Sequence, residues 1–228
     1  MKEKTTGAKG PGRPAAAEMG DTRERLLDAA TRLFSEKGVA GTSMAEIASD
    51  VGVTSAMIHY YFKTRNHLLE AVVEERMAKA IIGVQKRMLG PESELLDIVR
   101  ELVVNLLAMA MENVWFPPLW IREIASEGGH LRERLLAKMP FDMQKQLCDS
   151  IVNGQRRGTV NPDINPHLFF VSIIGQTLFP LAVSKIWRRF PTLGSLDNQA
   201  LVDHATSLLL YGLAGCGPER RERKNYEE

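Results

Sequence analysis

The sequence predicts an all-α protein in which a small three-helix head precedes a larger helical domain. Apolar side chains recur at helical spacing along most of the chain, and residues that favour helix caps stand before several of these segments. No stretch shows the strict alternation of apolar and polar residues that marks a half-buried strand. At 228 residues the chain is long enough for a small domain and a larger one.

Charge is nearly balanced over the whole chain. Lys and Arg number 29 and Asp and Glu number 28, so the net charge of +1 does not indicate a nucleic-acid partner. Residues 1–65 carry ten basic and eight acidic side chains (net +2), and the remainder carries 19 and 20 (net −1). This is a weak electrostatic footprint for a DNA-binding protein, so charge has to be judged locally.

Cysteine usage and hydropathy indicate a reduced, non-membrane setting. Cys148 and Cys216 are far apart and lack the paired spacing of a metal site, so reduced thiols are expected. The most apolar run, residues 168–183, has 16 residues and contains Pro180. It is shorter than the roughly 20 residues that span a bilayer. Because the N-terminus also lacks the apolar core of a signal peptide, we expect a cytoplasmic protein with no membrane partner.

Residues 1–20 are rich in Lys, Gly, Pro and Ala, and their lack of periodicity predicts a disordered arm. Within the arm, Gly12-Arg13-Pro14 resembles the arginine arms that insert into a narrow minor groove of DNA. A plain flexible terminus is the alternative. A capping box at Asp21 and Glu24 then predicts a first helix from about residue 22 to 37.

The stretch 42–62 is typical of two short helices separated by a glycine. Ser43 and Glu46 form a capping box for the first of them. Gly52 favours the left-handed conformation that ends a helix, and Thr54 is placed to cap the second. A helix of barely two turns must be held by its neighbours, because helix nucleation is costly. This arrangement is a helix-turn-helix, whose second helix enters the major groove of DNA.

The second short helix has an inner and an outer side. We expect Val53 and Ile58 to face inward, and Phe34 to pack against Ile47 and Phe62 in a small core. The outer side combines hydroxyls, methyl groups and aromatic rings, which suit phosphates, thymine methyls and the sugar-phosphate backbone. These outer residues are Thr54, Ser55, Ala56, Met57, His59 and Tyr60.

The segment Gly52–Phe62, with Thr42–Ala48 before it and Lys63–Leu69 after it, resembles the DNA-binding domain of the tetracycline-repressor (TetR) family. The resemblance covers roughly residues 21–70. It implies a three-helix DNA-binding head followed by a helical domain that dimerises and holds a small-molecule inducer. The expected divisions are a disordered N-terminal arm (1–20), a helix-turn-helix DNA-binding domain (21–66), a helical ligand-binding and dimerisation domain (67–217) and a disordered tail (218–228).

The resemblance also implies roles for single residues. Arg65 matches the usual lysine that contacts phosphate from the start of the fourth helix. Four residues match positions that face the groove: Ser55, Ala56, Met57 and Tyr60. The full set of expected DNA contacts is Arg13, Thr42, Ser43, Thr54, Ser55, Ala56, Met57, His59, Tyr60, Lys63, Thr64 and Arg65.

Further helices are expected beyond the head. Thr64 is placed to cap a long helix that runs to about Leu89 and couples the head to the second domain. A short segment follows Trp115. The other helices are expected at about 91–113, 130–157 (interrupted or kinked at Pro140), 167–188 and 197–214. The last two are too apolar for burial on one side, which favours a twofold contact between two copies of the chain.

The second domain contains methionine, aromatic and amide side chains that suit an apolar or aromatic guest. An ordinary core is the alternative interpretation for each of them. The candidate ligand-binding residues are Met109, Asn113, Trp115, Phe116, Trp120, Met139, Phe141, Met143, Gln176 and Phe179.

The sequence therefore predicts a homodimeric transcriptional repressor that a small hydrophobic or aromatic ligand releases from palindromic double-stranded operator DNA. We expect no catalytic residue, cofactor or metal site, because the sequence lacks nucleophile elbows, phosphate-binding loops, dinucleotide fingerprints and paired metal ligands. An enzyme, and a helical protein-binding adaptor with no DNA function, are the alternatives.

Overall fold

The computed structural model describes residues 16–86, 93–139 and 141–214. Within these ranges the chain contains no strand, and its β-type pairing is limited to an isolated bridge between Val160 and Ala214. The prediction of an all-α fold is confirmed. No helix in the described ranges combines the length and the apolar character that crossing a bilayer requires. Arg13, most of the predicted arm and the predicted tail lie outside the described residues.

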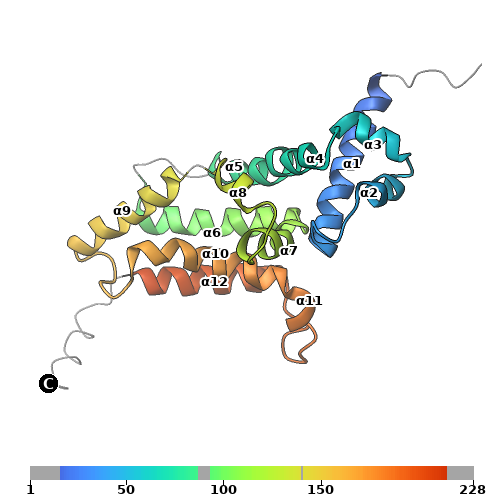
Figure 1. Cartoon of the computed structure of the whole chain (residues 1–228). Helices are drawn as coiled ribbons and strands as arrows, with labels where there is room; N and C mark the ends of the chain where they lie inside the picture. The colour runs from blue at the N-terminus through green and yellow to red at the C-terminus, as the bar shows by residue number, and fades with distance from the viewer. Residues whose placement is uncertain (1–15, 87–92, 140, 215–228) are drawn as a thin grey trace, which may run out of the picture.

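The helices form a head and a body. Their bounds in chain order are α1 (Ala16–Lys37), α2 (Met44–Val51), α3 (Ser55–Phe62), α4 (Arg65–Val72), the π-helical turn η1 (Val73–Ala78), α5 (Lys79–Lys86), α6 (Leu95–Glu112), α7 (Phe116–Trp120), the π-helical turn η2 (Ile121–Ala125), α8 (Arg132–Leu136), α9 (Asp142–Arg156), α10 (Pro166–Ala182), α11 (Ser184–Trp187) and α12 (Asn198–Leu213). Figure 1 shows α1, α2 and α3 as a head at one end, from which α4 leads into the body. Helix α6 packs against both α10 and α12.

The head is organised around α1. Phe34 and Ile47 are fully buried and Phe62 is nearly so, and the three belong to one core, as predicted. The helix begins at Ala16 rather than near residue 22, so the predicted arm is shorter than expected. Alanine, glutamate and methionine precede Asp21 and are strong helix formers, which extends the helix backward.

The predicted long helix after the head is present, with one irregularity. Thr64 caps it as expected, because its hydroxyl accepts a hydrogen bond from the His67 N–H at 3.3 Å. The chain is then helical from Arg65 to Lys86, but the middle section, η1, has π-helical hydrogen bonding. The last residues predicted for this helix, 87–89, lie outside the described ranges.

Two predicted helices of the body are divided in the structure. The segment predicted at 130–157, with an interruption or kink at Pro140, consists of two helices, α8 and α9; proline supplies no N–H and disfavours helix just before it. The segment predicted at 167–188 ends as α10 at Ala182 and resumes as the short α11. Helix α6 begins at Leu95, a few residues later than predicted.

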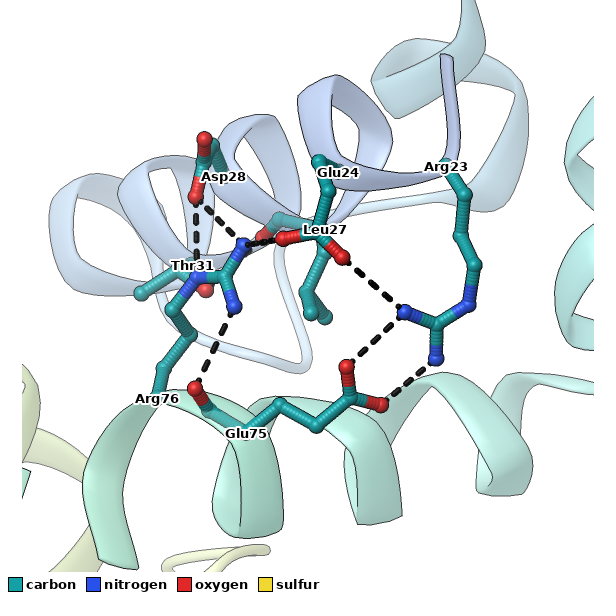
Figure 2. A network of polar contacts seen from close by, with 7 residues as sticks. All are labelled: Arg23, Glu24, Leu27, Asp28, Thr31, Glu75 and Arg76. Carbon is teal, nitrogen blue, oxygen red and sulfur yellow. Dashed lines mark hydrogen bonds and ion pairs between the residues drawn. The ribbon is translucent and has the colours of Figure 1, made fainter. Parts of the chain in front are cut away.

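Charged side chains join α1 of the head to η1 (Figure 2). Arg23 donates to both carboxylate oxygens of Glu75, at N–O distances of 2.8 and 2.5 Å. Arg76, the next residue, donates to Asp28 at 2.9 Å and to Glu24 at 2.7 Å. Hydrogen bonding from Arg23 lowers the pKa of Glu75 below its ordinary value. Two neighbouring residues of η1 therefore reach opposite charges on α1 and fix the head against the body.

Replacing Glu75 by glutamine is expected to lower the free energy of unfolding by about 0.5–1 kcal/mol, because partly exposed ion pairs contribute little more than this. The pKa of Glu75 is lower in the folded state, so its contribution is present above the unfolded-state pKa of about 4.3 and is lost as the pH falls through the folded-state pKa. Urea unfolding at about pH 7 and about pH 2 should show the difference between Glu75→Gln and wild type shrinking in acid.

The matched control for this prediction is Glu133→Gln. Glu133 is exposed and has no side-chain partner among the described residues. Its replacement should change the free energy of unfolding little at either pH. Equal effects of the two substitutions, or a Glu75→Gln effect that persists in acid, would contradict the role given to the ion pair.

Candidate nucleic-acid interface and ligand cavity

The turn between α2 and α3 has the geometry of a helix-turn-helix. The Ser43 hydroxyl accepts a hydrogen bond from the Glu46 N–H at 3.1 Å and caps α2, as predicted. Gly52 has a φ of 77°, and the Val53 N–H donates to the Ala48 carbonyl at 2.9 Å. The left-handed glycine thus ends α2 and redirects the chain into α3.

Two details of the caps were not predicted. The Glu46 carboxylate pairs with the Lys37 ammonium in addition to the hydrogen bond from the Ser43 N–H that the capping box predicts. The contact with Lys37, more than that with Ser43, lowers the pKa of Glu46. Thr54 stands at the start of α3 as predicted, but its side chain makes no capping hydrogen bond. Its hydroxyl is therefore not occupied by the helix start.

Helix α3 presents most of the residues predicted to face DNA. Its inner side is held by Ile58, which is fully buried, and by Phe62. Met57 and Val53 are half-buried. Five of the six residues expected on the outer side of this helix are exposed: Thr54, Ser55, Ala56, His59 and Tyr60. Hydroxyls, a methyl group, an imidazole and a phenol ring therefore share one accessible surface.

Lys63 connects α3 to α4 in an unusual backbone conformation. Its φ of 52° makes it the one non-glycine residue with positive φ among the described residues. Its ψ of −61° lies outside the ordinary left-handed region, so the conformation is strained. The His59 ring nitrogen lies 3.2 Å from the Lys63 carbonyl oxygen and holds this turn. The exposed lysine side chain is thus carried on a defined turn beside α3.

Arg65 and Thr42 were expected to contact DNA, but the structure gives both a different role. The Arg65 guanidinium donates to the Thr42 carbonyl at 2.6 Å and to the Val39 carbonyl. The Thr42 side chain is buried, and its hydroxyl donates to the Gly38 carbonyl at 2.9 Å. Backbone carbonyls in the loop between α1 and α2 require donors, which these side chains supply. We therefore treat Arg65 and Thr42 as positioning residues for the head.

The other basic side chains of the head are mostly engaged within the chain. Residues 16–72 contain six Lys and Arg residues. Five of them bond to carboxylates or carbonyls of the chain itself: Arg23, Arg25, Arg32, Lys37 and Arg65. Lys63 is exposed and has no partner among the described residues. It is the formal positive charge most available to a phosphate in this part of the molecule.

Glu123 is a functional candidate that sequence reasoning missed. It lies in η2 and is the one buried charged residue among the described residues, with 4% exposure. One carboxylate oxygen accepts from the Val39 N–H at 2.8 Å, and the other accepts from the His130 N–H at 2.9 Å. Val39 belongs to the loop that leads into α2. Glu123 therefore ties the head to the body segment that follows α7.

The body contains an apolar cavity of about 280 Å³. Helices α5, α6, α7, α9 and α10 contribute to its walls. The rings of Phe116 and Trp120 form a stacked pair in the wall, with centroids 5.9 Å apart and planes at 22°. Six of the candidate ligand-binding residues line it: Met109, Phe116, Trp120, Met139, Phe141 and Met143.

The structure places the remaining four candidates elsewhere. Asn113 and Trp115 line a separate polar hollow beside the ion pairs of Figure 2, and the Asn113 amide donates to the Met109 carbonyl of its own helix at 2.9 Å. Gln176 and Phe179 are exposed on the outer side of α10, and Phe179 is 55% exposed. These two were misplaced because α10 is apolar around most of its circumference.

Exposed large apolar side chains form a stripe along α10 and α12. The stripe consists of Leu168 and Phe179 of α10 and Leu208 and Tyr211 of α12. Val171 is also exposed but borders the cavity. Small or polar residues, such as Gly175, lie between them, and a side chain added at Gly175 would meet open space. In Figure 1, α10 and α12 run side by side along one edge of the body.

Comparison with known proteins supports the interpretation of the head. Residues 26–72 match the family model of bacterial regulatory proteins of the tetR family. The head of this chain is a DNA-binding domain of the tetR family. The chain is 33% identical to the HTH-type transcriptional regulator AcrR of Shigella flexneri over 98 residues, which are 42% of this chain and 44% of AcrR. It is 43% identical to the probable HTH-type transcriptional regulator YttP of Bacillus subtilis over 54 residues, 24% of this chain and 26% of YttP.

The whole architecture of the chain also resembles solved structures. The structure of AibR has a TM-score of 0.64 and 20% identity, and the match covers 83% of this chain and 98% of AibR. The likeness confirms the fold of a helix-turn-helix head and a larger helical domain. The matched relatives are named as transcriptional regulators, so the enzyme alternative is set aside and the adaptor alternative is not favoured.

Proposed function

We propose that this chain is a homodimeric repressor that binds a palindromic operator through its two α3 helices and leaves it when a small hydrophobic ligand fills the cavity. The accessible face of α3 behind a capped, glycine-ended α2 is the observation that carries the proposal. In this proposal the DNA-binding domain extends to about residue 66, and the rest of the body binds the ligand and the second copy.

The unpartnered stripe on α10 and α12 supports a dimer. A recognition helix of two turns contacts few base pairs, so a second copy doubles the footprint on a symmetric site. Contiguous exposed apolar surface indicates a protein–protein contact, and a self-complementary twofold contact buries two copies of it at once. Gly175 and Ser172 on the stripe permit two helices to approach closely.

The cavity supports regulation by a ligand. The solved structure of AibR is described as a complex with isovaleryl coenzyme A and operator DNA, so a protein of this architecture binds a small molecule and DNA. In the present chain the cavity wall at Trp120 is followed directly by η2, whose Glu123 holds the loop that leads into α2. Occupancy of the cavity can therefore act on the head through a short stretch of chain.

Selection of duplexes from a random library by the purified protein tests this function. The expected result is enrichment of an inverted repeat whose half-sites are about 10 base pairs apart or a multiple of that. Tyr60→Ala should weaken binding to the selected site by about tenfold and change binding to random duplex much less. Failure to enrich any sequence would count against the proposal, and equal loss on both duplexes would favour an adaptor.

Removing residues 1–14 is expected to weaken DNA binding by at least about tenfold. Counterions released from the DNA favour binding, and each lost phosphate contact reduces their number. The deletion stops short of α1 and removes Lys2, Lys4, Lys9 and Arg13. Since Lys63 is the one basic residue of the described head without a partner, the arm supplies most of the remaining positive charge near the DNA. Affinities of the full-length and shortened proteins, measured on A·T-flanked and G·C-flanked operators at one salt concentration, check this.

Comparing the A·T-flanked and G·C-flanked operators distinguishes two explanations of the lost affinity. A larger loss on A·T flanks is expected if Arg13 enters a narrow minor groove. An equal loss on both flanks leaves only the electrostatic explanation. Unchanged affinity after the deletion would contradict both, and sedimentation of the shortened protein should still show a dimer.

A further inference from the structure

We propose that the cavity takes a small uncharged ligand that has a flat apolar part and one hydrogen-bonding group, and that the amides of Gln85 and Gln144 bind this group. The inference rests on the proposed function, because it assigns a ligand chemistry to the cavity named there. It differs from the sequence expectation in its polar residues, since that expectation placed Asn113 and Gln176 at the ligand.

The cavity wall argues against a charged ligand. Among the described residues that line it, none is Asp, Glu, Lys or Arg, and His167 is the one titratable side chain. The His167 ring nitrogen Nδ1 already lies 3.4 Å from the Cys148 sulfur. Transfer of an unpaired carboxylate or ammonium ion into such a site is far more costly than transfer of a neutral polar group. An uncharged ligand is therefore the one that this wall favours.

Two amides in the wall are unused by the protein. Gln85 of α5 and Gln144 of α9 are half-buried and line the cavity, yet neither side chain has a hydrogen-bond partner among the described residues. Gln155, which is also half-buried, donates to two backbone carbonyls at 2.9 and 2.7 Å. Polar groups in apolar surroundings are normally satisfied in this way. The free amides are thus suited to a donor or acceptor on a ligand.

The size and the rings of the cavity define the rest of the ligand. A volume of about 280 Å³ is nearly twice that of a cavity of about 150 Å³ that binds benzene. One or two fused rings therefore fit. Phe116 and Trp120 offer a stacked aromatic surface, and Met109, Met139 and Met143 can adapt to the shape of a ring.

Titration calorimetry with matched naphthalene derivatives tests the inference. The probes share one ring system and differ in the polar group: 2-naphthol is neutral, 2-naphthoate is an anion and 2-naphthylmethylammonium is a cation. We expect 2-naphthol to bind at least about tenfold more tightly than either ion, because burial of an unpaired charge opposes the ions. An ion that binds as tightly as 2-naphthol, or no binding of any probe, would overturn the inference.

Variants of the two glutamines supply the second part of the test. Gln85→Leu and Gln144→Leu should each weaken 2-naphthol about threefold to tenfold, which is the usual effect of one neutral hydrogen bond. Neither substitution should weaken the binding of naphthalene, which has no polar group. Gln146→Leu is the matched control, because Gln146 is exposed on the same helix and lies outside the cavity wall. Equal effects of Gln144→Leu on naphthol and naphthalene would contradict the role of the amide.

DNA release is measured separately. If 2-naphthol binds with the expected preferences but does not lower operator affinity, the ligand chemistry stands and the proposed regulatory function is weakened. If the ions bind best and release DNA, the regulatory function stands and the inference about ligand charge is wrong.

Discussion

Replacing Glu123 by alanine is expected to lower the free energy of unfolding by about 1–3 kcal/mol, because a buried N–H left without an acceptor costs about that much. Two N–H groups lose their acceptor in this variant, the buried one of Val39 and the part-buried one of His130. Relief of the cost of burying a carboxylate offsets part of the loss. The head loop should also open more often, since Glu123 is the body side chain that holds the Val39 N–H.

Amide hydrogen exchange at Val39 measures this opening directly. The rate should rise by at least about tenfold in Glu123→Ala, corresponding to about 1.4 kcal/mol. Glu123→Gln retains one oxygen acceptor, so its exchange rate at Val39 should lie between those of wild type and Glu123→Ala. Glu127→Ala is the control, because Glu127 is exposed two residues beyond η2 and has no side-chain partner among the described residues. Unchanged exchange at Val39 in Glu123→Ala would contradict the proposed tie.

Replacing Phe179 by glutamate is expected to weaken the proposed dimer by more than about a hundredfold, because two unpaired carboxylates would have to be buried in a twofold contact. Phe179 is 55% exposed in the single chain and lies on the stripe of α10. Folding of the single chain should therefore change little. Operator affinity should fall with the dimer, since one α3 helix contacts half of a symmetric site.

Sedimentation velocity and circular dichroism check this prediction together. Phe179→Glu should sediment as a monomer with the helix content of wild type. Val114→Glu is the matched control, because Val114 is 78% exposed but lies outside α10 and α12. A Phe179→Glu protein that remains dimeric would show that the contact lies on another surface.

Interactions within a few residues explain what could be predicted from the sequence. Ser43, Gly52 and Thr64 act on backbone groups up to four residues away, so their spacing was enough to locate the ends of α2 and the start of α4. The small core of the head followed from the helical spacing of its apolar residues. The helix-turn-helix was therefore predictable almost completely.

Long-range contacts explain what could not be predicted. Arg65 bonds to carbonyls 23 and 26 residues earlier, and Glu123 bonds to an N–H 84 residues earlier. No spacing pattern indicates such partners. The cavity was half predictable for a similar reason: methionines and aromatic residues mark an apolar site, but the uniform hydrophobicity of α10 does not show which side faces the cavity. Gln176 and Phe179 were misplaced for that reason, and Gln85 and Gln144 were overlooked.

The stoichiometry of the protein on its selected operator tests the central claim most directly. Sedimentation equilibrium of the protein with a duplex that carries the full inverted repeat, and with one that carries a single half-site, gives the number of chains on each. We predict two chains on the full site, with an affinity at least about a hundredfold greater than on the half-site. One chain bound equally well to both duplexes would contradict the account of this protein as a dimeric DNA-binding regulator.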